Sequence, residues 1–135
     1  MKNIVIIPSR LDSTRFPRKP LKEILGMPMI GHCYHRAKMA TNIDEVFVAT
    51  CDHEIADYIN SIGGRIVMTS FSHKRASTRT AEALETIEKE MNNKIEIIVM
   101  VQGDEPMISP SIINGTLPHF HNNQVQIVNI ISKLS

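Results

Sequence analysis

Ile4 to Leu21 form the sequence IVIIPSRLDSTRFPRKPL, an uncharged apolar run followed directly by a cationic segment. The β-branched run from Ile4 to Ile7 predicts a buried strand. Three prolines in the remainder favour extended or turn conformations and oppose helix formation, so this second part is predicted to be a loop. A loop that follows the first strand of an open α/β sheet lies where such sheets bind ligands.

The loop contains four cations: Arg10, Arg15, Arg18 and Lys19. Arginine offers a bidentate fork to phosphate oxygens and lysine a mobile point charge. Backbone N–H groups near Ser13 and Thr14 add further donors. We therefore interpret the loop as a phosphate-binding segment, and a solvated basic loop is the alternative.

The composition restricts the classes of function. The chain has 135 residues, of which 42% are hydrophobic and 21% charged, with a formal net charge of +1. This predicts one domain, residues 1–135, with an ordinary core. The near-neutral charge argues against binding to nucleic acids or membranes. Cys33 and Cys51 form no CxxC pair and fit free buried thiols, and no signal peptide or membrane span is evident, so we expect a soluble, cytoplasmic protein.

Strands and helices alternate along the chain. Apolar, β-branched runs predict further strands at residues 46–50, 66–68, 97–101 and 125–131. Helical spacing of apolar residues predicts helices at residues 28–40 and 53–62, another from Ser77 or Thr78 to Met91, and a short one opened by Ser109 and Pro110. Such alternation predicts an α/β fold with mostly parallel strands and right-handed crossovers.

Two details of these helices are specific enough to test. Asp52 is expected to cap the helix over residues 53–62, and Gly63 and Gly64 to end it. The following helix is expected to bury one apolar stripe and to expose its glutamates to solvent. That stripe consists of Ala81, Leu84, Ile87 and Met91.

Asp104 is the main candidate for a metal ligand. It follows the most hydrophobic predicted strand, residues 97–101, directly after Gly103. Magnesium takes hard oxygen ligands, usually one or two carboxylates together with substrate phosphates. The alternative is that Asp104 or Glu105 only shapes a turn before Pro106.

Two longer motifs stand out in the sequence. The first is Arg10-x-x-Ser13-Thr14-Arg15-x-Pro17-x-Lys19-Pro20-Leu21, and the second is VQGDEPMI at residues 101–108. They resemble the signatures of the sugar nucleotidyltransferases that make CMP-activated acidic sugars, in particular the CMP-Kdo synthetases. The resemblance runs from Asn3 to about Ile131. It implies a Rossmann-like three-layer sandwich of the nucleotide-diphospho-sugar transferase type. Members of this family are longer, which implies that the chain corresponds to their amino-terminal portion, either as a truncated or fragmentary chain or as a separately evolved short relative.

The resemblance implies transfer of CMP from CTP to the anomeric hydroxyl of 3-deoxy-manno-octulosonate (Kdo), with release of pyrophosphate, for lipopolysaccharide synthesis. It implies catalytic roles for Arg10, Lys19 and Asp104, with Mg²⁺ bound to Asp104. The implied nucleotide contacts are Pro8, Arg10, Ser13, Thr14, Arg15, Lys19, His73, Ser77, Arg79 and Gln102. The implied partners are CTP, an acidic sugar and a second copy of the chain in a homodimer. For Asp52, a ribose contact is the second interpretation after the helix cap.

The sequence departs from the family's pattern at two glycines. Residues 73–79, HKRASTR, correspond to a loop that usually reads His-x-Ser-Gly-Thr-acidic-Arg and reaches the cytosine and ribose. Ala76 occupies the position of that glycine, where it would hinder a positive φ or a close approach of the base. Arg18 occupies the position where the family often has glycine between the proline and the lysine.

Three classes of function remain open. The first is a cytidylyltransferase for Kdo or for another acidic sugar, a nonulosonate, and the wording of the second motif favours Kdo. The second is a catalytically silent nucleotide-binding module, favoured because the sequence contains no second motif like that of Asp104. The third is a plain α/β structural or partner-binding domain. Alanine at Lys19 or Arg15 would leave CTP binding unchanged only in this third class.

Overall fold

The computed structural model describes residues 3–11, 18–72, 75–91, 95, 97–101 and 126–130. The strands are β1 (Asn3–Ser9), β2 (Glu23–Ile24), β3 (Met27–Pro28), β4 (Glu45–Thr50), β5 (Arg65–Met68), β6 (Ile97–Val101) and β7 (Gln126–Ile130). The helices are α1 (Met29–Lys38), α2 (His53–Ser61) and α3 (Ala76–Met91), with a 3₁₀ turn η1 (Lys19–Leu21). The strands predicted at residues 4–7, 46–50, 66–68, 97–101 and 125–131 are confirmed to within three residues at each end, whereas the helix predicted from Ser109 lies outside the described residues.

The main sheet has the strand order β5-β4-β1-β6-β7, and every pairing in it is parallel. β1 is central, with Ile6 opposite Phe47 of β4 on one side and Met100 of β6 on the other. The predicted α/β fold with a mostly parallel sheet is therefore confirmed. The chain order reverses at β1, because β4 and β5 extend the sheet one way and β6 and β7 the other.

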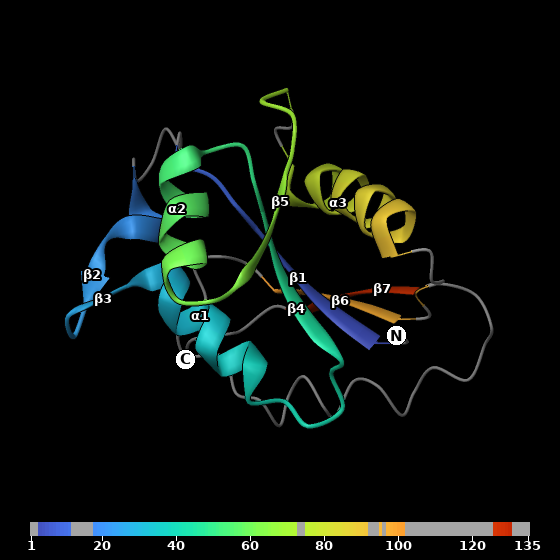
Figure 1. Ribbon diagram of the computed structural model, residues 1–135, viewed down its shortest axis with the longest axis horizontal. Coiled ribbons are helices and arrows are strands. Elements are labelled where there is room, and N and C mark those ends of the chain that lie inside the picture. The colour runs from blue at the N-terminus through green and yellow to red at the C-terminus, as the bar shows by residue number, and fades with distance from the viewer. Residues whose placement is uncertain are drawn as a thin grey trace.

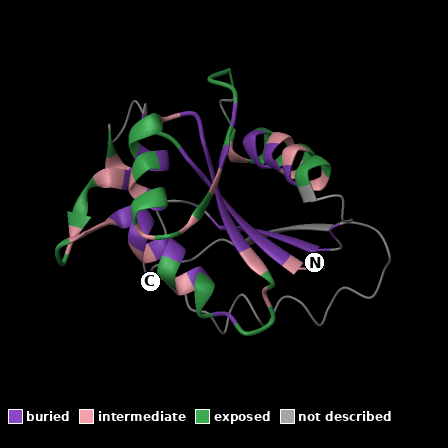
Figure 2. Ribbon diagram, viewed as in Figure 1, coloured by how far each residue is buried: buried purple, intermediate pink, exposed green. Residues whose placement is uncertain are grey.

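Helices cover both faces of the sheet and make three layers (Figure 1). Val5 and Ile7 of β1 pack in the core under α1 and α2, whereas Ile4 and Ile6 pack in the core under α3. Successive side chains of a strand point to opposite faces, so a strand covered on both faces needs an unbroken apolar run. The run from Ile4 to Ile7 meets that need, and Figure 2 shows the central strands buried along their length.

The end of α2 agrees with the sequence prediction. Gly63 has a φ of 77°, a left-handed conformation that glycine adopts without steric cost. Its N–H donates to the carbonyl of Asn60, and the N–H of Gly64 donates to the carbonyl of Ile59. This pair of bonds is a Schellman motif, which satisfies carbonyls that the helix leaves unpaired.

α3 differs from the prediction in its start and its buried face. It begins at Ala76, so Ser77 and Thr78 lie in its first turn and do not cap it. Leu84 and Ile87 pack toward the sheet as predicted, whereas Ala81 is exposed and the stripe is completed by Thr80 and Ala83. The predicted side-chain position of Met91 lies outside the described residues. The sequence prediction missed Thr80 because it is polar. Its hydroxyl donates to the carbonyl of Ala76 at 2.8 Å, which satisfies the hydroxyl within the helix and allows its burial.

β2 and β3 form a hairpin with a strained turn. The two turn residues, Leu25 and Gly26, have φ values of 54° and 80°, and Leu25 is 96% exposed. Positive φ at both positions is typical of a type I′ turn, which favours Asn-Gly. At Leu25 the left-handed conformation is sterically unfavourable, and the exposed side chain contributes no stabilising burial.

Replacing Leu25 with asparagine is therefore expected to raise the free energy of unfolding by about 1 kcal/mol, measured by urea denaturation. Leu25→Ala is the matched control, because alanine keeps the left-handed strain and the leucine side chain makes little buried contact. The explanation is wrong if both variants are equally stable.

Candidate functional site

The carboxyl ends of the parallel strands meet at one edge of the sheet. Arg10 directly follows β1, Asp52 follows β4 and Thr69 follows β5. The reversal of strand order lies between β1 and β6, and open α/β sheets bind ligands in the crevice outside such a point. The structure therefore brings the start of the cationic loop to the place where this fold class binds its ligands.

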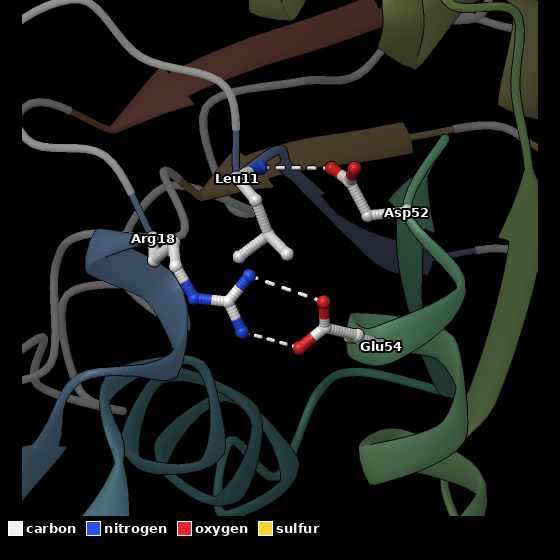
Figure 3. A network of polar contacts seen from close by, with 4 residues as sticks. All are labelled: Leu11, Arg18, Asp52 and Glu54. Atoms are coloured by element: carbon white, nitrogen blue, oxygen red, sulfur yellow. Dashed lines mark hydrogen bonds and ion pairs between the residues drawn. The ribbon is translucent and has the colours of Figure 1, made fainter.

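Hydrogen bonds fix the start of the cationic loop. The Leu11 N–H donates to Oδ2 of Asp52 at 2.8 Å, and the Leu11 side chain is buried in the core with α1 and α2 (Figure 3). The Leu11 carbonyl in turn accepts the Arg18 N–H at 2.8 Å, which closes the loop between these residues. Asp52 occupies the N-cap position of α2 but makes no capping bond with its side chain, so the predicted cap is wrong. Its carboxylate binds the loop instead.

An ion pair fixes the end of the loop. Both terminal nitrogens of Arg18 bind the carboxylate of Glu54, with Nη1 3.1 Å from Oε1 (Figure 3). Arg18 is exposed, and its hydrogen bonds are the main cause that lowers the pKa of the Glu54 carboxyl below its ordinary value. The Arg18 backbone has a φ of 62°, a left-handed conformation. This is a conformation that glycine adopts without steric cost, which gives a physical reason for the expectation that glycine often occupies this position.

Two of the predicted phosphate ligands flank these contacts. Arg10 is exposed next to Leu11, and Lys19 is half-buried next to Arg18 as the first residue of η1. Pro8 is buried in β1 and pairs with Ala49. The predicted contacts Ser13, Thr14, Arg15, His73, Gln102 and Asp104 lie outside the described residues and stay predictions.

The segment that connects β5 to α3 holds two more of the predicted ligands. Ser77 is exposed in the first turn of α3. Arg79 is only 3% exposed, and its Nη1 donates to Oγ1 of Thr69 at 2.6 Å, so it holds the end of β5. A contact between either residue and a nucleotide remains a prediction. Ala76 is helical and is not among the positive-φ residues of the described chain, so the alanine introduces no backbone strain there.

Two glutamates for which the sequence predicts no role, Glu54 and Glu82, bind the loops at this edge. Glu54 pairs with Arg18, and Glu82 accepts the Ser70 N–H through Oε1 at 3.1 Å. No local sequence pattern identifies either contact. Arg18 lies in the loop after β1 and Glu54 in the first turn of α2 after β4, and the adjacency of β1 and β4 in the sheet brings them together.

The Ser9 side chain places a buried hydroxyl at the same edge. The hydroxyl of Ser9, at the carboxyl end of β1, is buried and has no hydrogen-bond partner within the part of the chain that the structure describes. Unsatisfied buried hydroxyls are uncommon, because each costs the free energy of its lost hydration. An unpaired hydroxyl at this end of β1 is suited to a polar ligand or to the loop that follows.

The cysteines and the possible metal-binding residues form no further site in the described part of the chain. Cys33 and Cys51 are buried free thiols, as predicted. Across residues 3–11, 18–72, 75–91, 95, 97–101 and 126–130, no group of three His, Cys, Asp or Glu side chains is placed to hold a metal ion. No helix in these ranges has the length and apolar character needed to cross a membrane.

Comparison with known proteins gives consistent matches. The family model described as Cytidylyltransferase matches residues 4–135. A 3-deoxy-manno-octulosonate cytidylyltransferase of Actinobacillus pleuropneumoniae is 44% identical over 100% of this chain and 52% of its own length. The mitochondrial protein of the same name from Arabidopsis thaliana is 46% identical over 83% of this chain and 37% of its own. The chain thus spans about half or less of the length of these relatives.

Solved structures also resemble this fold. A CMP:2-keto-3-deoxy-manno-octonic acid synthetase complexed with CTP superposes with a TM-score of 0.80 at 35% identity, covering 88% of this chain and 47% of that one. A cytidylyltransferase from Leptospira borgpetersenii gives a TM-score of 0.73 at 26% identity, covering 89% of this chain and 49% of that one.

Proposed function

Because this chain belongs to the cytidylyltransferase family, we propose that it forms the CTP-binding part of an enzyme that transfers CMP from CTP to Kdo. The observation that carries the proposal is the closed cationic loop at the carboxyl end of β1, where Arg10 and Lys19 flank hydrogen-bonded Leu11 and Arg18. A solved relative whose name specifies this synthetase, complexed with CTP, shares the fold and supports the choice of nucleotide.

The reaction is a nucleotidyl transfer. The anomeric hydroxyl oxygen of Kdo bonds to the α-phosphorus of CTP, the bond from that phosphorus to the oxygen bridging to the β-phosphorus breaks, and pyrophosphate leaves. Such a reaction needs positioning and neutralisation of charge more than covalent participation by the protein. In the proposal, Arg10, Arg15 and Lys19 bind the triphosphate and stabilise the charge that develops on the leaving pyrophosphate.

Asp104 is the residue proposed to hold a magnesium ion. It follows Val101, the last residue of β6, by three positions in the sequence. A carboxylate together with triphosphate oxygens forms the hard oxygen donor set that magnesium prefers, so the donor chemistry fits this ion. When bound, the ion would supply Lewis-acid polarisation of the phosphate and lower the pKa of the attacking hydroxyl.

The direct test is magnesium-dependent release of pyrophosphate by the purified 135-residue chain in the presence of CTP and Kdo. Turnover with Kdo supports the whole proposal, whereas turnover only with another acidic sugar, such as a nonulosonate, corrects the substrate. CTP binding without turnover identifies a nucleotide-binding part that does not complete the reaction alone. Absence of both turnover and CTP binding contradicts the proposal.

Lys19 provides the sharpest test of the phosphate site. Lys19→Ala is expected to raise the dissociation constant for CTP about 10- to 100-fold, because a hydrogen bond to a charged group contributes about 1.5–3 kcal/mol. Isothermal titration calorimetry measures the constant. The matched control is Lys89→Ala, which removes the same charge from an exposed position near the end of α3. If both variants lost the same affinity for CTP, the change in net charge would explain the loss, and a specific contact between Lys19 and phosphate would be contradicted.

A further inference from the structure

We infer that Asp52 and Glu54, at the amino-terminal end of α2, are positioning residues that set the geometry of Arg10 and Lys19 for the triphosphate. The inference rests on the proposed function, since it concerns the same CTP site. Both carboxylates bind a neighbour of a predicted phosphate ligand rather than the ligand itself. Asp52 binds Leu11, next to Arg10, and Glu54 binds Arg18, next to Lys19.

Asp52 acts on the backbone at the start of the loop. Its Oδ2 accepts the Leu11 N–H at 2.8 Å, and its own N–H donates to Oγ1 of Thr50 at 3.1 Å. Thr50 is the last residue of β4 and is fully buried, so the backbone of Asp52 is anchored to the end of β4. The direction in which the chain leaves β1 at Arg10 therefore depends on the Asp52 carboxylate.

Glu54 acts on a strained residue at the end of the loop. Arg18 holds a left-handed conformation that is unfavourable for a residue with a β-carbon. Its N–H bond to Leu11 and its ion pair with Glu54 restrain that conformation, and η1 with Lys19 begins directly after it. The pair also directs the Arg18 guanidinium toward α2 (Figure 3).

The negative charges of Asp52 and Glu54 allow an experiment to separate an electrostatic role from a positioning role. Asp52 and Glu54 are acids beside a site proposed for the highly negative triphosphate of CTP, so their charges alone oppose binding. Removing either charge would tighten CTP binding if the carboxylates contributed only electrostatics. Removing either contact weakens binding if the carboxylates position the loop. The sign of the change in affinity therefore separates the two explanations.

The experiment measures CTP affinity by calorimetry for the full 135-residue chain and its variants. Asp52→Ala is expected to raise the dissociation constant about five- to tenfold, the equivalent of one hydrogen bond. Asp52→Asn is expected to bind CTP at least as tightly as the unaltered chain, because the amide oxygen still accepts the Leu11 N–H and the opposing negative charge is removed. Asp57→Ala is the matched control, since Asp57 is an exposed acid on the same helix. The CTP affinity of this variant is expected to equal that of the unaltered chain.

Glu54 is tested through its partner. Glu54→Ala is expected to raise the dissociation constant about threefold, as for an exposed ion pair. Arg18→Gly is the reference for the second comparison, because glycine adopts the left-handed conformation without a partner. The double variant of Arg18→Gly with Glu54→Ala should bind CTP with the affinity of Arg18→Gly alone, whereas a general loss of stability would weaken binding further.

The outcomes distinguish the inference from the proposed function. If the unaltered chain does not bind CTP, the proposed function is wrong and the inference with it. If the unaltered chain binds CTP and the alanine variants bind it equally or more tightly, only the inference is overturned. Should Asp52→Ala fail to fold by circular dichroism, the Arg18 and Glu54 variants still decide the matter.

Discussion

Asp104→Asn is expected to lower magnesium-dependent pyrophosphate release at least about 100-fold, because the substitution removes the proposed metal ligand while keeping the size of the side chain. The magnesium dependence of CTP affinity should be lost as well. That second readout does not need turnover, so it applies even if the chain binds CTP without completing the reaction. Both measurements are made over a magnesium titration with CTP held constant.

Asp57→Asn is the control, since it makes the same chemical change at an exposed position on α2. Its magnesium dependence should match that of the unaltered chain. An unchanged magnesium response in Asp104→Asn would favour the alternative interpretation, in which Asp104 only shapes the turn before Pro106.

Ile7→Ala is expected to lower the free energy of unfolding by about 2–5 kcal/mol, which is a large part of the stability of a typical domain. Ile7 is fully buried in β1 and packs in the core with Val48 and Ile55. The surrounding helices and strands cannot collapse fully into the space that the smaller side chain leaves. Urea denaturation followed by circular dichroism gives the difference.

Met39→Ala is the control for this experiment, because Met39 is 66% exposed just after α1 and should change stability by less than about 0.5 kcal/mol. A loss at Ile7 no larger than that at Met39 would contradict the assignment of β1 to the centre of the core. It would also remove the rigid support on which the loop after β1 depends.

The parts of the fold that depend on local patterns were predictable. The apolar runs at residues 4–7 and 97–101 identify the two adjacent central strands, since only a strand covered on both faces stays apolar throughout. The glycines at 63 and 64 mark the end of α2 because their backbone requirements are local. The position of Arg10 and Lys19 near the edge of the sheet follows from the same local reasoning.

The contacts that organise the site were not predictable in the same way. The pattern around Asp52 equally suits a helix cap, and its bond to Leu11 exists only because β1 and β4 are neighbours. Glu54 looks like an ordinary solvated acid until Arg18 is placed beside it. Thr80 was missed for a different reason, since a polar residue is buried only when a partner such as the Ala76 carbonyl is already in place.

The central place of β1 has a consequence for how the chain folds as it is synthesised. During synthesis β4 emerges before β6, so β1 can pair with β4 first. The other edge of β1 stays unpaired until β6 has been made, because Asn3 of β1 pairs with Ile97 of β6. At about 5–20 residues per second, the roughly 50 residues between β4 and β6 take about 2–10 s to emerge from the ribosome. During that interval the apolar β1 presents an open edge that can pair with other chains. Chaperone dependence should therefore concentrate in the interval before β6 appears, and early truncation before Ile97 should produce aggregation rather than a smaller folded domain.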